Sequence, residues 1–130
     1  MKMFRRFLRA GLCWAAGLAA FPVLAYAQAT PAPGDAVAGK GAYAACQACH
    51  DLDANKAGPK HRGLVGRKAA TAAGFKYSVA LRDSGLTWTA QNLDAWLQDP
   101  GTMVPGTKMY FLVSDAKQRA DIIAYLATEK

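Results

Sequence analysis

The sequence predicts an all-α domain in which helices are joined by long loops and no sheet forms. No stretch of the chain alternates apolar and polar residues for long, so the two-residue period of a half-buried strand is absent. In contrast, Leu93, Trp96 and Leu97 repeat at the i, i+3, i+4 spacing of one helix face, and residues 122–126 carry a second apolar cluster. Both observations favour helices that each bury one apolar face.

Capping residues and helix breakers give the bounds of three main helices. An Asp, Ser or Thr side chain caps the first turn of a helix, and a helix usually ends before proline because the residue preceding proline avoids the helical conformation. We expect one helix from an N-cap at Asp35 into residues 46–50, one from Thr87 or Thr89 to Asp99, one from after Ser114 through 122–126, and a short helical turn over 77–82.

The first of these helices contains two glycines, Gly39 and Gly41. A glycine inside a helix costs about 1 kcal/mol relative to alanine. We therefore expect another backbone, that of the last helix, to cross close to both positions.

The motif Cys46-Gln47-Ala48-Cys49-His50 is a C-x-x-C-H, which is typical of covalent attachment of a c-type haem. Two thiols three residues apart lie on one side of a helical turn, so both can add to the vinyl groups of one porphyrin, and the next imidazole then faces the iron. Two other readings compete. A zinc site would use both cysteines with His50 and His61, and a thioredoxin-like dithiol would need a preceding strand, which the Ala/Gly-rich run before Cys46 does not predict.

The N-terminus has the pattern of a secretory signal peptide over residues 1–27. An uncharged, mostly apolar stretch from Ala10 to Leu24 precedes the A-x-A cleavage site Ala25-Tyr26-Ala27, and it follows the basic residues Lys2, Arg5, Arg6 and Arg9. Cleavage leaves a mature chain from Gln28, with a linker and the start of the first helix over 28–38 and one domain over 39–130. This predicts export to the periplasm, with an uncleaved membrane anchor as the alternative.

The mature chain would be only weakly basic. Without the signal, 12 Lys and Arg residues face nine Asp and Glu residues, a net charge of +3 in place of the +7 of the full sequence. The basic residues are scattered, so the charge pattern gives no support for nucleic-acid binding.

Several further motifs occur in a fixed order after C-x-x-C-H: Gly58-Pro59, Gly63-Leu64-Val65-Gly66-Arg67-Lys68, Gly85-Leu86-Thr87-Trp88 and Pro105-Gly106-Thr107-Lys108-Met109. With them the chain resembles a class I cytochrome c of the mitochondrial-type bacterial kind, from Gly39 to Leu126. The resemblance implies the cytochrome c fold, with three main helices and long loops around one covalent haem c, and a monomer that carries single electrons. It implies transient donors and acceptors among membrane or periplasmic redox proteins, with no small-molecule substrate and no enzymatic activity.

The same resemblance implies a role for each site residue. Cys46 and Cys49 would form the thioethers, His50 would be the proximal iron ligand and Met109 the distal one. Met103 is the other methionine left after signal removal, and it is the alternative distal ligand. The Pro59 carbonyl would accept a hydrogen bond from His50, and the haem propionates would be bound by Arg67, Tyr77 and Trp88.

The chain also departs from this family. His61 stands where relatives commonly have an apolar residue, and Trp96 and Leu81 replace a usual Tyr and Asn. Around Met109, Gly101 and Thr102 replace lysines that relatives use for docking. Two other functions remain open at this stage: a dedicated electron-transfer subunit of one dehydrogenase or oxidase, and a haem enzyme or gas-binding protein, which would need an open sixth iron position.

Overall fold

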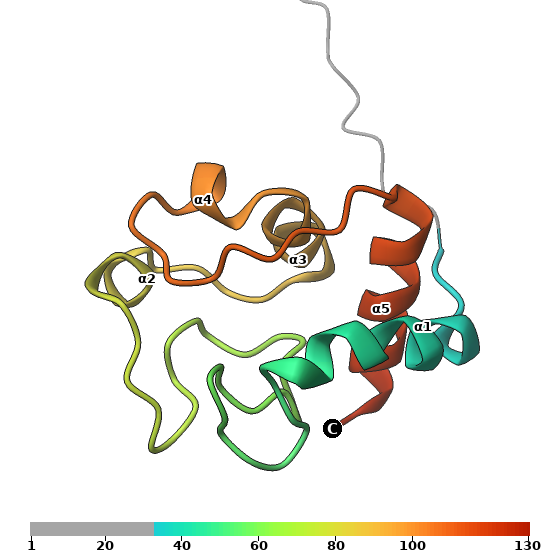
Figure 1. The fold of residues 1–130 in the computed structure, drawn as a ribbon, viewed down its shortest axis with the longest axis horizontal. Coiled ribbons are helices and arrows are strands. Elements are labelled where there is room, and N and C mark those ends of the chain that lie inside the picture. The colour runs from blue at the N-terminus through green and yellow to red at the C-terminus, as the bar shows by residue number, and fades with distance from the viewer. Residues whose placement is uncertain (1–32) are drawn as a thin grey trace, which may run out of the picture.

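The computed structural model describes residues 33–130 (Figure 1). Along them lie α1 (Ala36–Ala42), the 3-10 helix η1 (Tyr43–Ala48), α2 (Val79–Asp83), α3 (Ala90–Gln98), α4 (Pro100–Met103) and α5 (Ala116–Thr128). These residues form no strand beyond one isolated bridge between Lys68 and Thr87. The prediction of an all-α fold with three main helices, α1, α3 and α5, is confirmed. The predicted signal peptide and the first part of the linker lie outside the described residues.

Each main helix begins at a side-chain cap. Asp35 accepts hydrogen bonds from the backbone N–H groups of Val37 and Ala38 at the start of α1. Thr89 caps α3, which decides between the two threonines predicted for this position, and Asp115 caps α5. Local sequence therefore sets where all three helices start.

The residues that end α3 also start the next helix, α4. Asp99 ends α3, and its carboxylate accepts from the backbone N–H of Thr102 at 3.0 Å, with Pro100 at the first helical position of α4. Proline is well suited to that position because its missing N–H would have no partner there. The end of α3 at Asp99 is as predicted from the sequence, whereas the following helix α4 was not predicted.

The first helix tightens before it reaches the cysteines. From Tyr43 the chain continues as the 3-10 helix η1, so the predicted helix into residues 46–50 is α-helical only as far as Ala42. The Cys46 carbonyl then accepts from the N–H groups of both Cys49 and His50, at 3.1 and 2.9 Å. This turn keeps the two cysteines and the histidine together at the end of one helix.

Helices α1 and α5 cross in close contact (Figure 1). A Cβ atom added at Gly39 would overlap the Asp121 carbonyl of α5, whereas one added at Gly41 would meet no atom within 4 Å. The predicted close crossing is therefore confirmed at Gly39 and wrong at Gly41, which lies on a side of α1 that α5 does not touch. Asp121 adds a polar link, because its carboxylate accepts from the backbone N–H of Asp35 at 2.6 Å.

A buried arginine joins α5 to the rest of the fold. Arg119 donates to the Asp94 carboxylate of α3 at 2.7 Å, and to the carbonyls of Val113 and Ser114 at 3.0 and 2.9 Å. A buried charge is tolerated when it is paired and hydrogen-bonded, as the Arg119 Nε and Nη1 groups are here. These contacts hold the last loop, α3 and α5 in one arrangement.

Within the described residues, no helix is both long enough and apolar enough to span a membrane.

Candidate functional site

A cavity of about 670 Å³ opens between η1, α3 and the loops that precede α2 and α5. Its size is that of a site for a large organic ligand, and aromatic and aliphatic side chains form much of its wall. Every site residue predicted from the sequence lines this one cavity: Cys46, Cys49, His50, Pro59, Arg67, Tyr77, Trp88 and Met109. Residues from positions 46 to 109 are thus gathered around a single space.

His50 is buried and oriented by the backbone. Its ring Nδ1 hydrogen-bonds the Pro59 carbonyl at 2.8 Å, as the resemblance implied. Nε2 forms no hydrogen bond with another described residue, so it is the nitrogen available to a metal. Burial lowers the pKa of His50, with the bond to Pro59 acting in the opposite direction, and the neutral imidazole that results is the form that binds iron.

Two neighbours pack on the His50 ring. A Cβ atom added at Gly58 would overlap the Cε1 atom of that ring, so only glycine fits there. The ring of His61 stacks on His50, with centroids 4.0 Å apart and planes inclined by 23°. Burial, with repulsion from His50 in its protonated form and from Arg67, lowers the pKa of His61 to about 3, so this second imidazole is also neutral.

The two cysteines lie at the edge of the cavity with free thiols. Cys46 is half-buried and Cys49 is exposed. Across residues 33–130, no group of three or more His, Cys, Asp or Glu side chains is arranged to hold a metal ion. Two thiols and one free imidazole nitrogen beside a largely apolar cavity are the donor set that a covalent haem requires.

Met109 reaches the cavity through a tight turn. Val104, Pro105, Gly106 and Thr107 form a type II turn, in which Gly106 has φ +90° and the Thr107 N–H donates to the Val104 carbonyl at 3.0 Å. Proline at the second position and glycine at the third suit this turn, since the third position needs a positive φ. The turn explains why Pro-Gly precedes the methionine.

The sulfur of Met109 has one polar partner. The indole Nε1–H of Trp96 donates to Met109 Sδ at 3.1 Å. Met103, the alternative distal ligand, does not line this cavity and instead contributes to a shallower hollow of about 330 Å³ between α2 and α4. Of the two candidate methionines, only Met109 faces the site.

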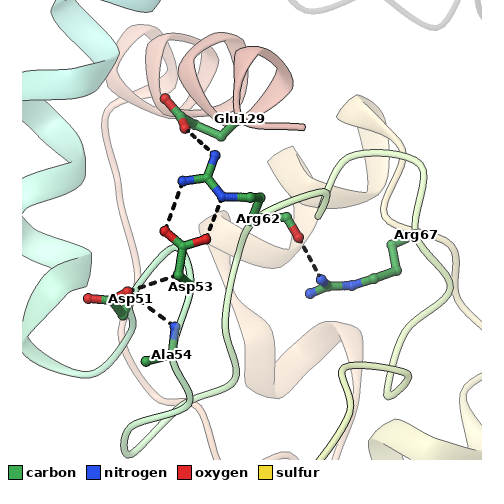
Figure 2. Close-up of polar contacts among 6 residues, drawn as sticks. All are labelled: Asp51, Asp53, Ala54, Arg62, Arg67 and Glu129. Atoms are coloured by element: carbon green, nitrogen blue, oxygen red, sulfur yellow. Dashed lines mark hydrogen bonds and ion pairs between the residues drawn. The ribbon is translucent and has the colours of Figure 1, made fainter.

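Arg67 is held by the backbone of the loop on the His50 side. Its guanidinium donates to the carbonyls of Lys60 and Arg62 at 2.9 and 3.0 Å, and the second bond is drawn in Figure 2. Burial lowers the pKa of Arg67, which nonetheless stays charged. Two of its five N–H donors are used, so three remain for an anion.

Tyr77 and Trp88 complete the polar edge of the wall. The Tyr77 hydroxyl accepts from the Ala72 N–H at 3.2 Å, which leaves its own proton to be donated. Trp88 is buried and meets Trp96 edge-on, with ring centroids 5.1 Å apart. Trp88 therefore also serves as core, as a tryptophan of this burial usually does.

The loop on the His50 side is tied to the C-terminus. Figure 2 shows Arg62 between the carboxylates of Asp53 and Glu129, with which it forms ion pairs. The Gly63 N–H also donates to the Glu129 backbone carbonyl at 2.7 Å. The pKa of Asp53 lies below its usual range because Arg62 hydrogen-bonds the ionised carboxylate.

Sequence reasoning missed two contacts at His50. Gly58 was noted only as part of a motif, and its close packing on the ring needs the fold to become visible. The pairing of His61 with His50 was also missed, although a histidine at a position that is usually apolar was a signal in its own right. Both residues come after His50 in the chain and reach its ring because the loop folds back, with Gly58 and His61 bonded through their N–H groups to the Cys49 and Asp51 carbonyls.

The mouth of the cavity is apolar beyond Met109. Tyr110 is 80% exposed, and Phe111 and Leu112 are about half exposed. Lys108 precedes them and also lines the cavity. Exposed apolar side chains next to a site are typical of a surface that contacts another protein.

The chain resembles known proteins over most of its length. The sequence model of the family described as "Cytochrome c" matches residues 36–130. The chain is similar to a cytochrome c2 of Rhodomicrobium vannielii, with 40% identity over 110 residues that cover 82% of this chain and 88% of the relative. Among solved structures it is similar to cytochrome cH from Methylobacterium extorquens, with 52% identity, a TM-score of 0.71 and coverage of 73% of this chain and 99% of that one. Ferricytochrome c2 from Rhodopseudomonas palustris shares 42% identity and a TM-score of 0.71, over 74% of this chain and 99% of that one.

Proposed function

Since the chain belongs to the cytochrome c family, we propose that His50 and Met109 hold the iron of its haem from two sides. As a member of that family the protein is a monohaem electron carrier and not an enzyme, with haem c attached through Cys46 and Cys49 and His50 beside them. The observation that supports the ligand pair is that a free imidazole nitrogen and a thioether sulfur face the same cavity.

Haem bound here supplies the reversible change of its iron between Fe(III) and Fe(II). His50 and Met109 would hold the iron, and the residues that line the cavity would bury the group while its mouth stays accessible to partners. The largely apolar wall favours the state of lower charge, and so does a thioether ligand. A positive reduction potential follows from both.

The remaining predicted residues act on the propionates. Arg67 supplies a positive charge and three unused donors, and Tyr77 supplies its hydroxyl proton. Trp88 contributes its indole N–H, which is the one hydrogen-bond donor of its side chain. These three groups offset the charge of two carboxylates that would otherwise be costly beside an apolar cavity.

The protein works in the periplasm after cleavage behind Ala27. The A-x-A site and the following Pro/Ala-rich linker support this. The purified protein should have the intact mass of Gln28 to Lys130 plus one haem, and the haem should survive acid-acetone extraction because thioethers do not dissociate. A mass that includes residues 1–27 would support the membrane anchor instead.

Partners dock at the exposed mouth of the cavity through short-lived contacts. Tyr110 and Phe111 supply apolar area there, and Lys108 supplies one charge. Exposed charges are screened beyond about 8 Å at physiological salt, so a face with few lysines gains little long-range attraction. Apolar contact therefore carries most of the binding.

The test of the ligand pair compares two methionine variants. Met109→Ala should abolish the near-infrared sulfur-to-iron band of the oxidised protein, lower the potential and allow carbon monoxide to bind, because a vacated sixth position accepts external ligands. Met103→Ala is the matched control and should change none of these. Ready binding of carbon monoxide by the unaltered protein would contradict the proposal and favour the gas-binding alternative.

A further inference from the structure

A second imidazole packs against the proposed proximal ligand. His61 stacks on His50 at a centroid distance of 4.0 Å and an angle of 23°. The edge of His50 is already held by the Pro59 carbonyl, and Gly58 allows the backbone close to its ring. A turn of the His50 ring about its Cβ–Cγ bond would drive it into His61.

The backbone of His61 is fixed close to His50. Its N–H donates to the carbonyl of Asp51, the residue directly after His50, at 2.9 Å. Its own carbonyl accepts from the Leu64 N–H at 2.8 Å. The stacked rings therefore sit on two backbone segments that are themselves bonded together.

The ring of His61 is fixed as well. A hydrogen bond of 3.1 Å joins His61 Nδ1 to the hydroxyl of Tyr43. Tyr43 is only 1% exposed, and its ring packs on Tyr125 of α5 with centroids 5.3 Å apart. A chain of contacts thus runs from α5 through Tyr43 and His61 to His50. Side chains locked by packing and hydrogen bonds in this way are what a preorganised site needs.

We propose that His61 is a positioning residue that sets the rotation of the His50 ring and places a polar group beside the iron. This rests on the proposed function, in which His50 is the proximal ligand. Groups just outside the ligand shell fix the orientation of a metal-bound imidazole, and the polarity around a site shifts its redox potential. Neither effect requires His61 to bind the iron.

The direction of the potential shift follows from the polarity of the wall. An aliphatic side chain in place of His61 removes a polar ring from the surroundings of the iron. A less polar environment disfavours the more highly charged oxidised site. His61 therefore lowers the reduction potential relative to a protein with an apolar residue at this position.

The experiment uses the full haem-containing protein and three variants. His61→Leu removes the stack and the hydrogen bond together. Because this leaves the buried Tyr43 hydroxyl without a partner, the double variant His61→Leu/Tyr43→Phe removes both bonding groups and protects the fold. His61→Phe keeps a flat ring against His50 but cannot bond Tyr43. The readouts are the reduction potential and the proton NMR shifts of the four haem methyl groups, which report the ring orientation of the axial ligands.

The single and double leucine variants should change the methyl shift pattern and raise the equilibrium constant for reduction by a fixed reference couple by about fivefold. His61→Phe should keep the methyl shift pattern of the unaltered protein, because a flat ring still packs on His50. Its reduction potential should nevertheless rise as in the leucine variants, because the polar group is lost. An unchanged methyl pattern in both leucine variants would overturn the positioning role, and an unchanged potential would overturn the role in tuning. Failure of the His50/Met109 ligand pair is seen separately, as carbon monoxide binding to the unaltered protein.

Discussion

The two loops that close the cavity are held in different ways. Residues 51–77, on the His50 side, are tied by ion pairs and by side-chain bonds to backbone, among them those of Arg62 and Arg67. Residues 104–113, on the Met109 side, form no ion pair with any described residue. That loop relies on its Pro-Gly turn, on the bonds that Val113 forms with the Leu97 carbonyl at 2.7 Å and with Arg119 at 3.0 Å, and on the bond from Trp96 to Met109.

The difference shows which of the two proposed ligands, His50 or Met109, the polypeptide holds in place without haem. His50 follows the cysteines on a helix end, and its ring is restrained by Pro59, Gly58 and His61. Met109 sits in the middle of a loop, and one hydrogen bond from Trp96 orients its sulfur. The proposed proximal ligand is therefore preorganised by the chain, whereas the proposed distal one would depend more on a bond to the iron.

The largest effect is expected on the preorganised side. Gly58→Ala would place a methyl group into the His50 ring, and the restraints on that ring leave little room for relief. Overpacking of this kind destabilises a fold by about 3 kcal/mol. Denaturant unfolding and the yield of haem-loaded protein measure it.

Gly41→Ala is the matched control for this substitution. A methyl group at Gly41 would meet no atom within 4 Å, and the position lies in the last turn of α1. Alanine there should stabilise the protein by up to about 1 kcal/mol, because alanine loses less conformational entropy in a helix than glycine. A Gly58→Ala protein as stable as the unaltered one would show that the proximal loop is less rigid than its contacts indicate.

On the Met109 side, Lys108→Glu tests the docking face. The change should slow reduction of the physiological acceptor by less than about tenfold at low salt, since a charge at the rim of an interface acts mainly on the association rate. The second-order transfer rate is measured across a range of ionic strength for both proteins. A steep fall in the rate of the unaltered protein with salt would contradict an apolar docking face.

Trp96→Phe tests how much the Met109 sulfur depends on its one partner. Without the indole donor the sulfur should donate more electron density to the iron and favour Fe(III), so the equilibrium constant for reduction should fall by about threefold. Potentiometry measures this value. The near-infrared band should persist, in contrast to Met109→Ala, because the sulfur itself is retained.

The smallest effect is a dependence on pH that only the His50-side loop should show. Arg62 lowers the pKa of Asp53 below the ordinary 3.8, so this pair stabilises the fold fully above pH 3.8 and the contribution is lost as the pH falls through the folded-state pKa. As the solution is acidified, amide protection factors, which correct the exchange rate for its intrinsic pH dependence, should fall in residues 51–63 before they fall in 104–113. Asp53→Asn should remove this order, and equal loosening of both loops in the unaltered protein would refute it.

The sequence by itself determined the helix starts to within two residues and, through C-x-x-C-H, the attachment of a haem. It also determined the turn before Met109, although that turn was not predicted from it. Asp35, Thr89 and Asp115 cap their helices through contacts with residues two or three positions away, and Pro105-Gly106 selects its turn through φ alone. C-x-x-C-H is likewise local, since one helical turn contains the whole motif. Signals of this kind act over a few residues and can be read without the fold.

Where the sequence offers two similar residues, only the tertiary structure decided which one packs against a distant segment or lines the cavity. Gly39 meets the α5 backbone and Gly41 meets nothing, although both lie in the same helix. Met109 faces the cavity while Met103 lies in another hollow, and His61 turns onto His50 rather than toward solvent. Each of these outcomes depends on the packing of segments distant in the chain, which the sequence around one residue does not encode.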